Sequence, residues 1–178
     1  MTRKLGNLGI LALAALAASV VLTACSSGGS DAAPDLAITV SQGADVIGEG
    51  EVTLAGIVDG GKPVVVNFWA ALCAPCRLEM PDFQRVHDAR ADEVTIVGVD
   101  IGPQWRLGTR EQGEALLAEL GITYPAGITS DPDVNTKFSI LGMPTTVFIY
   151  ADGRVLRTWT GALNEDKVNG FIDELLAG

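Results

Sequence analysis

Two cysteines placed directly after a buried-strand pattern constrain this chain more than any other feature. Residues Pro63–Trp69 form a short apolar, β-branched run, as expected of a strand covered on both faces. The run leads into Cys73-Ala74-Pro75-Cys76. Beyond Pro75 the pattern predicts a helix to about residue 89, with proline in its first turn, where the missing N–H is harmless. The cysteine pair is therefore expected at a strand-to-helix junction.

This position gives the two thiols different chemistry. Cysteines separated by two residues in a first helical turn can close a small disulfide ring, with only the first sulfur facing outward. Unpaired N–H groups and partial positive charge at a helix N-terminus favour thiolate at Cys73. A thiolate there can attack a substrate disulfide, and the second thiol can resolve the mixed intermediate. Cys73 is the predicted nucleophile and Cys76 the predicted resolving thiol.

Alternating strand and helix patterns over the rest of the chain predict an α/β domain in which helices cover a central sheet. The expected elements are short edge elements over 36–40 and 51–57, strands over 94–99, 145–150 and 155–159, and helices over 111–120, 131–141 and 165–177. Segment 102–110 is expected to form a surface loop that exposes Trp105, whereas Trp159 is expected in the core. We find no internal repeat.

The N-terminus has the pattern of a secretion signal. Arg3 and Lys4 precede an apolar run of about 15 residues, shorter than the roughly 20 that cross a bilayer as a helix. The run ends in Leu-Thr-Ala-Cys at Cys25, which resembles a bacterial lipoprotein signal whose cysteine carries lipid. The predicted organisation is a signal peptide over 1–24, a flexible tether over 25–35 that begins at the lipidated cysteine, and a folded domain over 36–178.

Charge and composition exclude several kinds of partner. The chain has 12 Lys+Arg against 22 Asp+Glu, a formal net charge of -10. Removing residues 1–24 takes away two positive charges and no acidic residue, so the mature chain carries -12. We expect no nucleic-acid binding and no electrostatic attachment to anionic lipid. No bound cofactor is implied, because the cysteine pair is itself the redox group, and a metal site would need more soft or imidazole ligands.

Residues 63–81 resemble the active-site segment of thioredoxin-like proteins, most closely the TlpA/ResA type of membrane-anchored thiol-disulfide oxidoreductase. A second match, Gly142-Met143-Pro144-Thr145-Thr146, resembles the cis-proline loop of that family. The resemblance covers about residues 36–177 and implies a thioredoxin-like fold, with a central mixed β-sheet flanked by helices. It implies a cis bond before Pro144, and it implies that Met143 and Pro144 contact substrate.

Asn67 and Leu72 depart from the commoner thioredoxin pattern. Asn67 stands where many thioredoxins carry a buried Asp that helps to move the proton of the resolving cysteine, and an amide cannot do this. Glu79 lies one helical turn after Cys76, where the resemblance implies a functional Glu, so we hypothesise that a partly buried Glu79 with a raised pKa relays that proton. Leu72 replaces an aromatic residue beside the first cysteine and is expected to alter substrate selection.

The expected function is extracytoplasmic reduction of protein disulfides. Ala74 and Pro75 place no charge and no His between the thiols, which favours a reductant over a strong oxidant. The resemblance implies a membrane thiol-disulfide electron donor and a possible role in cytochrome c maturation, and we expect a monomer. The strongest alternative is a non-catalytic binding lipoprotein with a structural disulfide. A metal chaperone and a thiol peroxidase are weaker alternatives, since a peroxidase pattern would need Pro at Val66 and Thr at Ala70.

Overall fold

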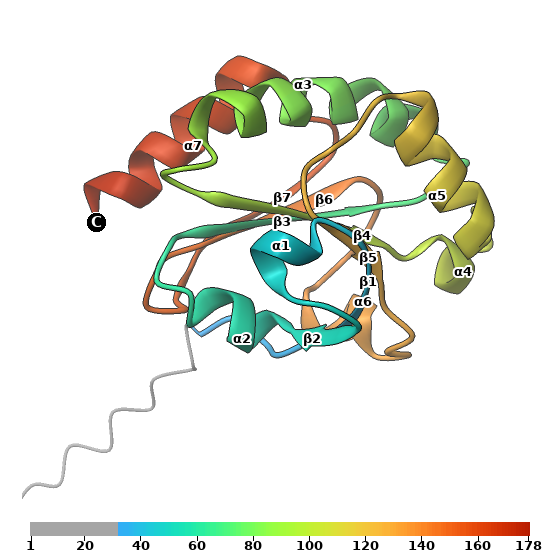
Figure 1. Ribbon diagram of the computed structural model, residues 1–178, viewed down its shortest axis with the longest axis horizontal. Coiled ribbons are helices and arrows are strands. Elements are labelled where there is room, and N and C mark those ends of the chain that lie inside the picture. Colours follow the sequence, from blue (N-terminus) through green and yellow to red (C-terminus); the bar gives the residue numbers. More distant parts are fainter. Residues whose placement is uncertain (1–31) are drawn as a thin grey trace, which may run out of the picture.

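The computed structural model describes residues 32–178, which form one seven-stranded sheet with helices on both faces (Figure 1). The strands are β1 Ala37–Gln42, β2 Glu51–Thr53, β3 Val64–Trp69, β4 Thr95–Asp100, β5 Ala126–Ile128, β6 Thr145–Ile149 and β7 Val155–Thr160. Their order in the sheet is β2-β1-β5-β4-β3-β6-β7. Strand β3 pairs parallel with β4 and antiparallel with β6, so the sheet is mixed as expected.

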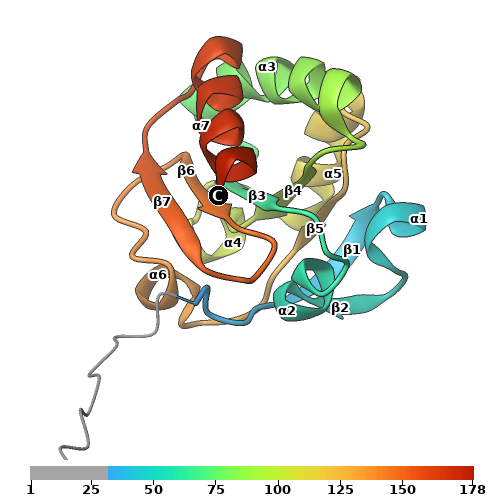
Figure 2. The ribbon, with the colours of Figure 1, turned by 90° about the vertical axis from the view of Figure 1, so that its left-hand side faces the viewer.

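The helices divide between the two faces of the sheet. They are α1 Ala44–Ile47, α2 Leu54–Val58, α3 Ala74–Arg90, α4 Gly102–Trp105, α5 Arg110–Glu119, α6 Val134–Lys137 and α7 Glu165–Ala177. Figures 1 and 2 show α3 and α7 side by side over one face, with α2 and α6 on the other. Two apolar clusters fill these layers, one under α3, α5 and α7 and the other under α2 and α6.

Strand β3 belongs to both layers because its side chains alternate. Val65 and Trp69 pack under α3, whereas Val64, Val66 and Phe68 pack on the opposite face, and every residue of the strand is buried. A strand covered on both faces reads as a continuous apolar run, and the one polar residue inside it, Asn67, is fully buried as well. That residue therefore needs polar partners on the α3 face.

The structure corrects several sequence-based expectations. Segment 51–57 is not one edge element: strand β2 ends at Thr53, whose side chain accepts a hydrogen bond from Gly56 N and so caps α2. Strand β1 is not an edge strand, because it lies between β2 and β5. The expected helix over 131–141 is confined to α6.

The aromatic expectations need correction too. Trp105 is not exposed: it ends α4, is half-buried, and its Nε1 donates to Asn135 Oδ1 at 2.8 Å. Trp159 is half-buried rather than central in the core, with Lys167 Nζ 4.3 Å from the centre of its ring. Both indole rings are thus half-buried, neither exposed nor in the centre of the core.

The described chain begins at the end of the sheet opposite to the cysteine pair. Ala32 forms an isolated antiparallel bridge with Arg154, and Ala33 N donates to Gly153 O at 2.8 Å. Residues 32–35 of the expected tether are therefore attached to the domain rather than free. The predicted signal peptide, Cys25 and the first part of the tether lie outside the described residues.

Candidate active site

Cys73 and Cys76 form a disulfide at the N-terminus of α3, the longest helix in the described chain. Their Cα atoms are 5.3 Å apart. Cys73 is the N-cap residue, and Cys76 N donates to its Sγ at 3.3 Å, so a backbone N–H of the first helical turn points at the first sulfur. Cys73 retains 6% exposure and Cys76 none, so an incoming sulfur reaches Cys73 first.

The loop that carries the disulfide rests on a second loop. Leu72 N donates to Leu107 O at 2.8 Å, and Leu107 N donates to Gly102 O at 2.9 Å. A Cβ on Gly108 would lie 2.9 Å from that of Ala71, which means that the two loops are in close backbone contact. The segment after β4 thus packs against the loop that carries Cys73 and holds it in place.

The residues expected to meet substrate gather at this end of the sheet. Thr145 at the start of β6 pairs with Phe68 at the end of β3, which brings the preceding loop to the edge where the disulfide lies. The Met143–Pro144 bond in that loop is cis, as the sequence resemblance implied. Leu72 is 59% exposed, and Met143 is half-buried. Their contacts with substrate remain predictions.

Glu79 is buried behind the disulfide with both carboxyl oxygens bonded. It is 1% exposed, although the hypothesis required only partial burial. Leu163 N donates to Oε2 at 2.9 Å and Asn67 Nδ2 donates to Oε1 at 2.7 Å. Burial raises the pKa of Glu79 from 4.5 to about 7, and the two hydrogen bonds lower it by less than burial raises it. At neutral pH this group can therefore both hold and release a proton.

A second buried carboxyl group, Asp100, escaped the sequence analysis. It ends β4 beside Trp69 and is 4% exposed, and its Oδ1 accepts from Gly102 N at 2.7 Å. Burial raises its pKa from 3.8 to about 6, against the lowering effect of that hydrogen bond. Asp100 fixes the start of the loop on which Leu72 rests. The signal that could have indicated it is a carboxylate that ends an otherwise apolar strand pattern.

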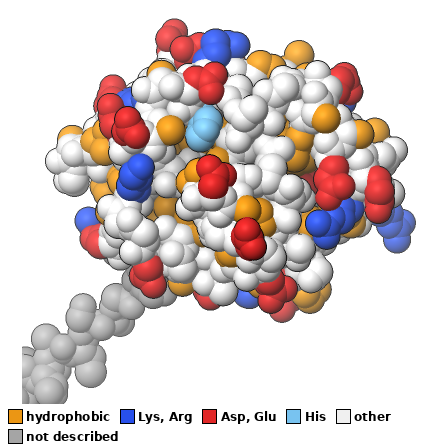
Figure 3. Space-filling view, in the orientation of Figure 1, with side chains coloured by type: hydrophobic (Ala, Val, Ile, Leu, Met, Phe, Trp, Pro, Cys, Tyr) orange, Lys and Arg blue, Asp and Glu red, His pale blue; other side chains and the backbone are white. Residues whose placement is uncertain are grey.

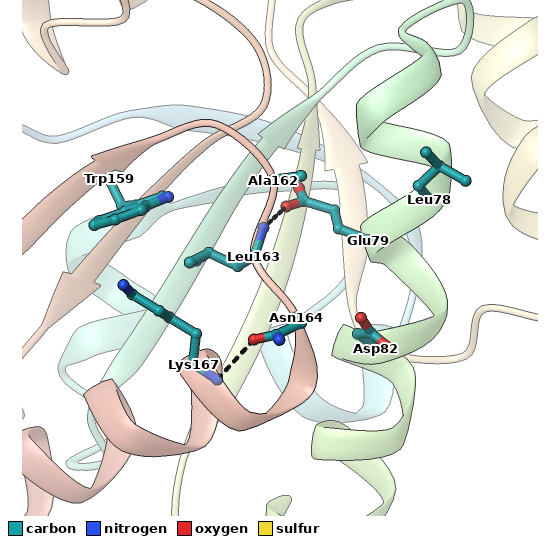
Figure 4. Close-up of a pocket in the computed structure, with 8 residues that line it drawn as sticks. All are labelled: Leu78, Glu79, Asp82, Trp159, Ala162, Leu163, Asn164 and Lys167. Carbon is teal, nitrogen blue, oxygen red and sulfur yellow. Dashed lines mark hydrogen bonds between the residues drawn. The ribbon is translucent and has the colours of Figure 1, made fainter.

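A pocket of about 460 Å³ opens beside Glu79, between α3 and the start of α7 (Figure 4). Trp159, Ala162 and Leu163 give it an apolar wall, with Asp82 and Lys167 at its borders. Figure 4 shows Glu79 reaching from α3 towards the backbone of Leu163, whereas Leu78 turns away on the outer side of the helix. Glu79 is among the residues that line the pocket, although it is only 1% exposed.

The surface offers no strongly basic face in the view of Figure 3, where Asp and Glu side chains are spread among neutral residues. Among residues 32–178 no group of three or more His, Cys, Asp or Glu side chains is arranged to hold a metal ion. Within the same residues none of the helices has the length and hydropathy that a bilayer crossing requires.

Comparison with known proteins gives one consistent result. The AhpC/TSA family matches residues 30–158. The chain is 37% identical over 120 residues to the thiol:disulfide interchange protein HelX of Rhodobacter capsulatus, covering 66% of this chain and 63% of HelX. It is 31% identical over 146 residues to the thiol-disulfide oxidoreductase ResA of Oceanobacillus iheyensis, covering 82% of this chain and 71% of ResA. The chain thus spans less than two thirds of HelX.

The solved structures agree in fold. A putative thiol:disulfide interchange protein DsbE from Chlorobium tepidum superposes with a TM-score of 0.67 and 25% identity, over 83% of this chain and 96% of its own. The StoA structure from Bacillus subtilis superposes with a TM-score of 0.63 at 20% identity, over 78% of this chain. The expected thioredoxin-like fold is confirmed.

Proposed function

Because this chain belongs to the AhpC/TSA family of thioredoxin-like proteins, we propose that it is an extracytoplasmic thiol-disulfide oxidoreductase that reduces disulfides in other proteins. The observation that carries the proposal is the asymmetry of the disulfide: Cys73 caps α3 and keeps 6% exposure, whereas Cys76 is fully buried one helical turn before the buried Glu79. Names of relatives such as HelX and ResA support the same activity.

The reaction starts from the reduced pair. The Cys73 thiolate, stabilised by the N–H groups of the first turn of α3, attacks one sulfur of a substrate disulfide. A bond forms between Cys73 and that sulfur, the substrate S–S bond breaks, and the departing substrate sulfur takes up a proton.

Resolution requires the second thiol to lose its proton. Glu79 lies one turn after Cys76 on the same face of α3, and a pKa of about 7 suits it to accept that proton. The Cys76 thiolate then attacks Cys73, the bond between Cys73 and the substrate breaks, and the second substrate sulfur leaves as a thiolate that takes up a proton. The substrate gains two electrons and the enzyme pair is oxidised. A membrane thiol-disulfide donor returns the pair to its dithiol form.

The substrate selectivity and location form part of the proposal. Leu72, Met143 and Pro144 contact the substrate chain near its disulfide, and Leu72 provides an apolar rim. The chain acts as a monomer attached to the membrane through lipid on Cys25. Apocytochrome c, whose cysteines must be reduced before haem attachment, is one such substrate.

Reduction of a protein disulfide by dithiothreitol, with catalytic amounts of the protein, tests the activity. We expect Cys73→Ala to abolish the rate enhancement, and Cys76→Ala to accumulate a mixed disulfide through Cys73, because the resolving thiol is missing. A purely structural disulfide predicts no enhancement by the wild-type protein. A thiol peroxidase predicts consumption of added peroxide that depends on Cys73.

The direction of electron flow has a separate measurement. Equilibration of the Cys73–Cys76 pair with glutathione should give a reduction potential near that of thioredoxin, about -270 mV, because Ala74 and Pro75 add no charge to stabilise the thiolate further. A potential near that of protein disulfide isomerase, about -180 mV, would indicate an oxidase or isomerase instead.

A further inference from the structure

The side-chain amide of Asn67 is the least expected contact of the buried site. Its Nδ2 donates to Glu79 Oε1 at 2.7 Å and to Thr146 Oγ1 at 3.1 Å, and both partners are buried. Its Oδ1 is buried as well and has no hydrogen-bond partner among residues 32–178. Leaving a buried acceptor unpaired is unfavourable, so the amide is not explained by stability alone.

The two hydrogen bonds at Glu79 suit only one of its protonation states. Leu163 N and Asn67 Nδ2 both donate, and a carboxylate accepts at both oxygens. A protonated carboxyl group has an O–H that needs an acceptor. The backbone N–H of Leu163 can only donate to Oε2, so the proton of the acid is favoured on Oε1. In the orientation described, however, Oε1 also faces a donor, Asn67 Nδ2.

Asn67 can remove this conflict by turning its amide over. A rotation of about 180° around its last side-chain bond exchanges Nδ2 with Oδ1, whose sizes are nearly equal. Oδ1 then accepts the O–H of Glu79. Thr146 lies directly opposite Asn67 in the β3–β6 pair, and its hydroxyl can either accept from Nδ2 or donate to Oδ1. Both neighbours of the amide can therefore be satisfied in either orientation, while the position that faces away from them is unpaired in both, holding Oδ1 in one and Nδ2 in the other.

We propose that Asn67 is a positioning residue whose amide reverses with the protonation of Glu79, donating N–H to the carboxylate and accepting O–H from the acid. The inference deepens the proposed function, because the proton concerned is the one that Glu79 exchanges with Cys76. The carboxyl group is then held in the same place before and after proton transfer. An Asp at this position would add a second buried charge, whereas Asn supplies a donor and an acceptor without one.

The ionisation of Glu79 can be observed separately from that of the other groups that face it. Cys76 lies on the same helix and does not titrate while it is in the disulfide. The hydroxyl of Tyr124 lies before β5, and burial together with the charge of Glu79 raises its pKa far from neutrality. Asp82 and Lys167 border the pocket as well. Oxidised protein therefore isolates Glu79 in this site.

Nuclear magnetic resonance of the oxidised protein tests the reversal. The carboxyl carbon of Glu79 reports its ionisation, and the nuclear Overhauser contact between the Asn67 amide protons and the Thr146 side chain reports the amide orientation. We expect that contact to be strong above the Glu79 midpoint and to disappear below it, with the same midpoint. Burial also raises the pKa of Asp100, to about 6, so the carboxyl carbons of Glu79 and Asp100 are assigned individually before the titration. An unchanged contact across the titration would overturn the proposal.

A pair of variants gives an independent test. Asn67→Ala should raise the Glu79 midpoint by roughly one pH unit, because a hydrogen bond to a carboxylate is stronger than one from a neutral acid. Thr146→Val, in the same buried site, should move it by only a few tenths, because the hydroxyl serves both orientations equally. Equal shifts in the two variants would show that loosening or hydration of the site is responsible, and would refute the proposal. None of these measurements needs turnover, so failure of the enzymatic assay with the wild-type protein would be a separate result.

Discussion

The carboxyl group of Glu79 is subject to two opposing influences, and burial is the larger. It sits at 1% exposure between α3 and β3, and two N–H groups favour its charged form. The resulting pKa of about 7 corresponds to roughly 3 kcal/mol relative to the ordinary value, at 1.36 kcal/mol per pKa unit. The residue that fits the proposed proton relay therefore also makes the fold dependent on pH.

We predict that Glu79→Gln removes part of this dependence. With a folded-state pKa of about 7 against 4.5, Glu79 binds its proton more tightly in the folded state. Its stabilising contribution is complete below pH 4.5 and is lost as the pH rises to about 7. Urea unfolding of the oxidised protein at pH 5 and pH 8 should show the variant gaining up to roughly 3 kcal/mol over the wild type between the two. Glu49→Gln, at an exposed carboxylate, is the matched control. Parallel curves for wild type and Glu79→Gln would contradict the prediction.

Sequence reasoning placed the predicted reactive residues on one helix but did not predict the contacts that hold them. Cys73, Cys76 and Glu79 could be predicted because their spacing fixes them on one helix end, and local spacing is visible in a sequence. For Asn67, the sequence indicates only that an amide cannot carry the proton of the resolving cysteine. Its contacts with Glu79 and Thr146 join three separate elements, so they follow only from the packing of β3 against α3 and β6.

Helices α7 and α5 each contain a glycine, one in open surroundings and one in a crowded site. Comparing the two distinguishes the effect of helix propensity on stability from the effect of packing. Gly170 in α7 has nothing within 4 Å of the place where a Cβ would stand. Gly113 in α5 faces Asp100, and a Cβ there would overlap the carboxyl group and lie 3.3 Å from the ring of Trp69. The first glycine is a weak point of its helix, whereas the second makes room for a buried charge.

Gly170→Ala should raise the free energy of unfolding by about 0.5–1 kcal/mol, because alanine is the better helix former and meets no obstacle. Gly113→Ala has the same gain in propensity but should lower stability by about 1–3 kcal/mol, because the added methyl group displaces Asp100. Urea denaturation of both variants measures the difference. A stabilised Gly113→Ala variant would show that the α5–β4 contact is looser than described.

At the scale of elements, long patterns were predictable and short ones were not. The buried run of β3 and the helix α3 carry clear signals over many residues. Strand β5 is three residues long, and its central Gly127 is there because a Cβ would meet Thr39 O at 2.5 Å. Such a strand exists through pairing with β1 and β4, each of which is separated from it in the sequence by intervening helices. No local pattern could have predicted it.

For the molecule as a whole, the two ends of the sheet have different roles. The disulfide and the loop with Met143 lie where β3 ends and β6 begins. The described chain starts at the opposite end, where Ala32 pairs with Arg154 and Ala33 with Gly153. The sequence-based expectation was a central mixed sheet without a strand order, because apolar patterns do not encode which strands are neighbours.

We predict that Cys25→Ser releases the protein from membranes. The mature chain carries a net charge of -12, so lipid on Cys25 is the proposed attachment and electrostatic binding cannot replace it. Fractionation of cells that express each form, with mass spectrometry of the N-terminal peptide, measures both location and modification. Wild-type protein found entirely in the aqueous fraction, with an unmodified Cys25, would contradict the prediction.

The bridge between Ala32 and Arg154 bears on how the proposed oxidoreductase would meet its partners. With Cys25 anchored as proposed, the domain is attached at one end of its sheet, and the reactive sulfur lies at the other end. The height of the sulfur above the bilayer then depends on the size of the domain and on the chain between Cys25 and Ala32. Under the same proposal, encounters become a two-dimensional search, and the proposed membrane donor must extend a thiol to the far end of the domain.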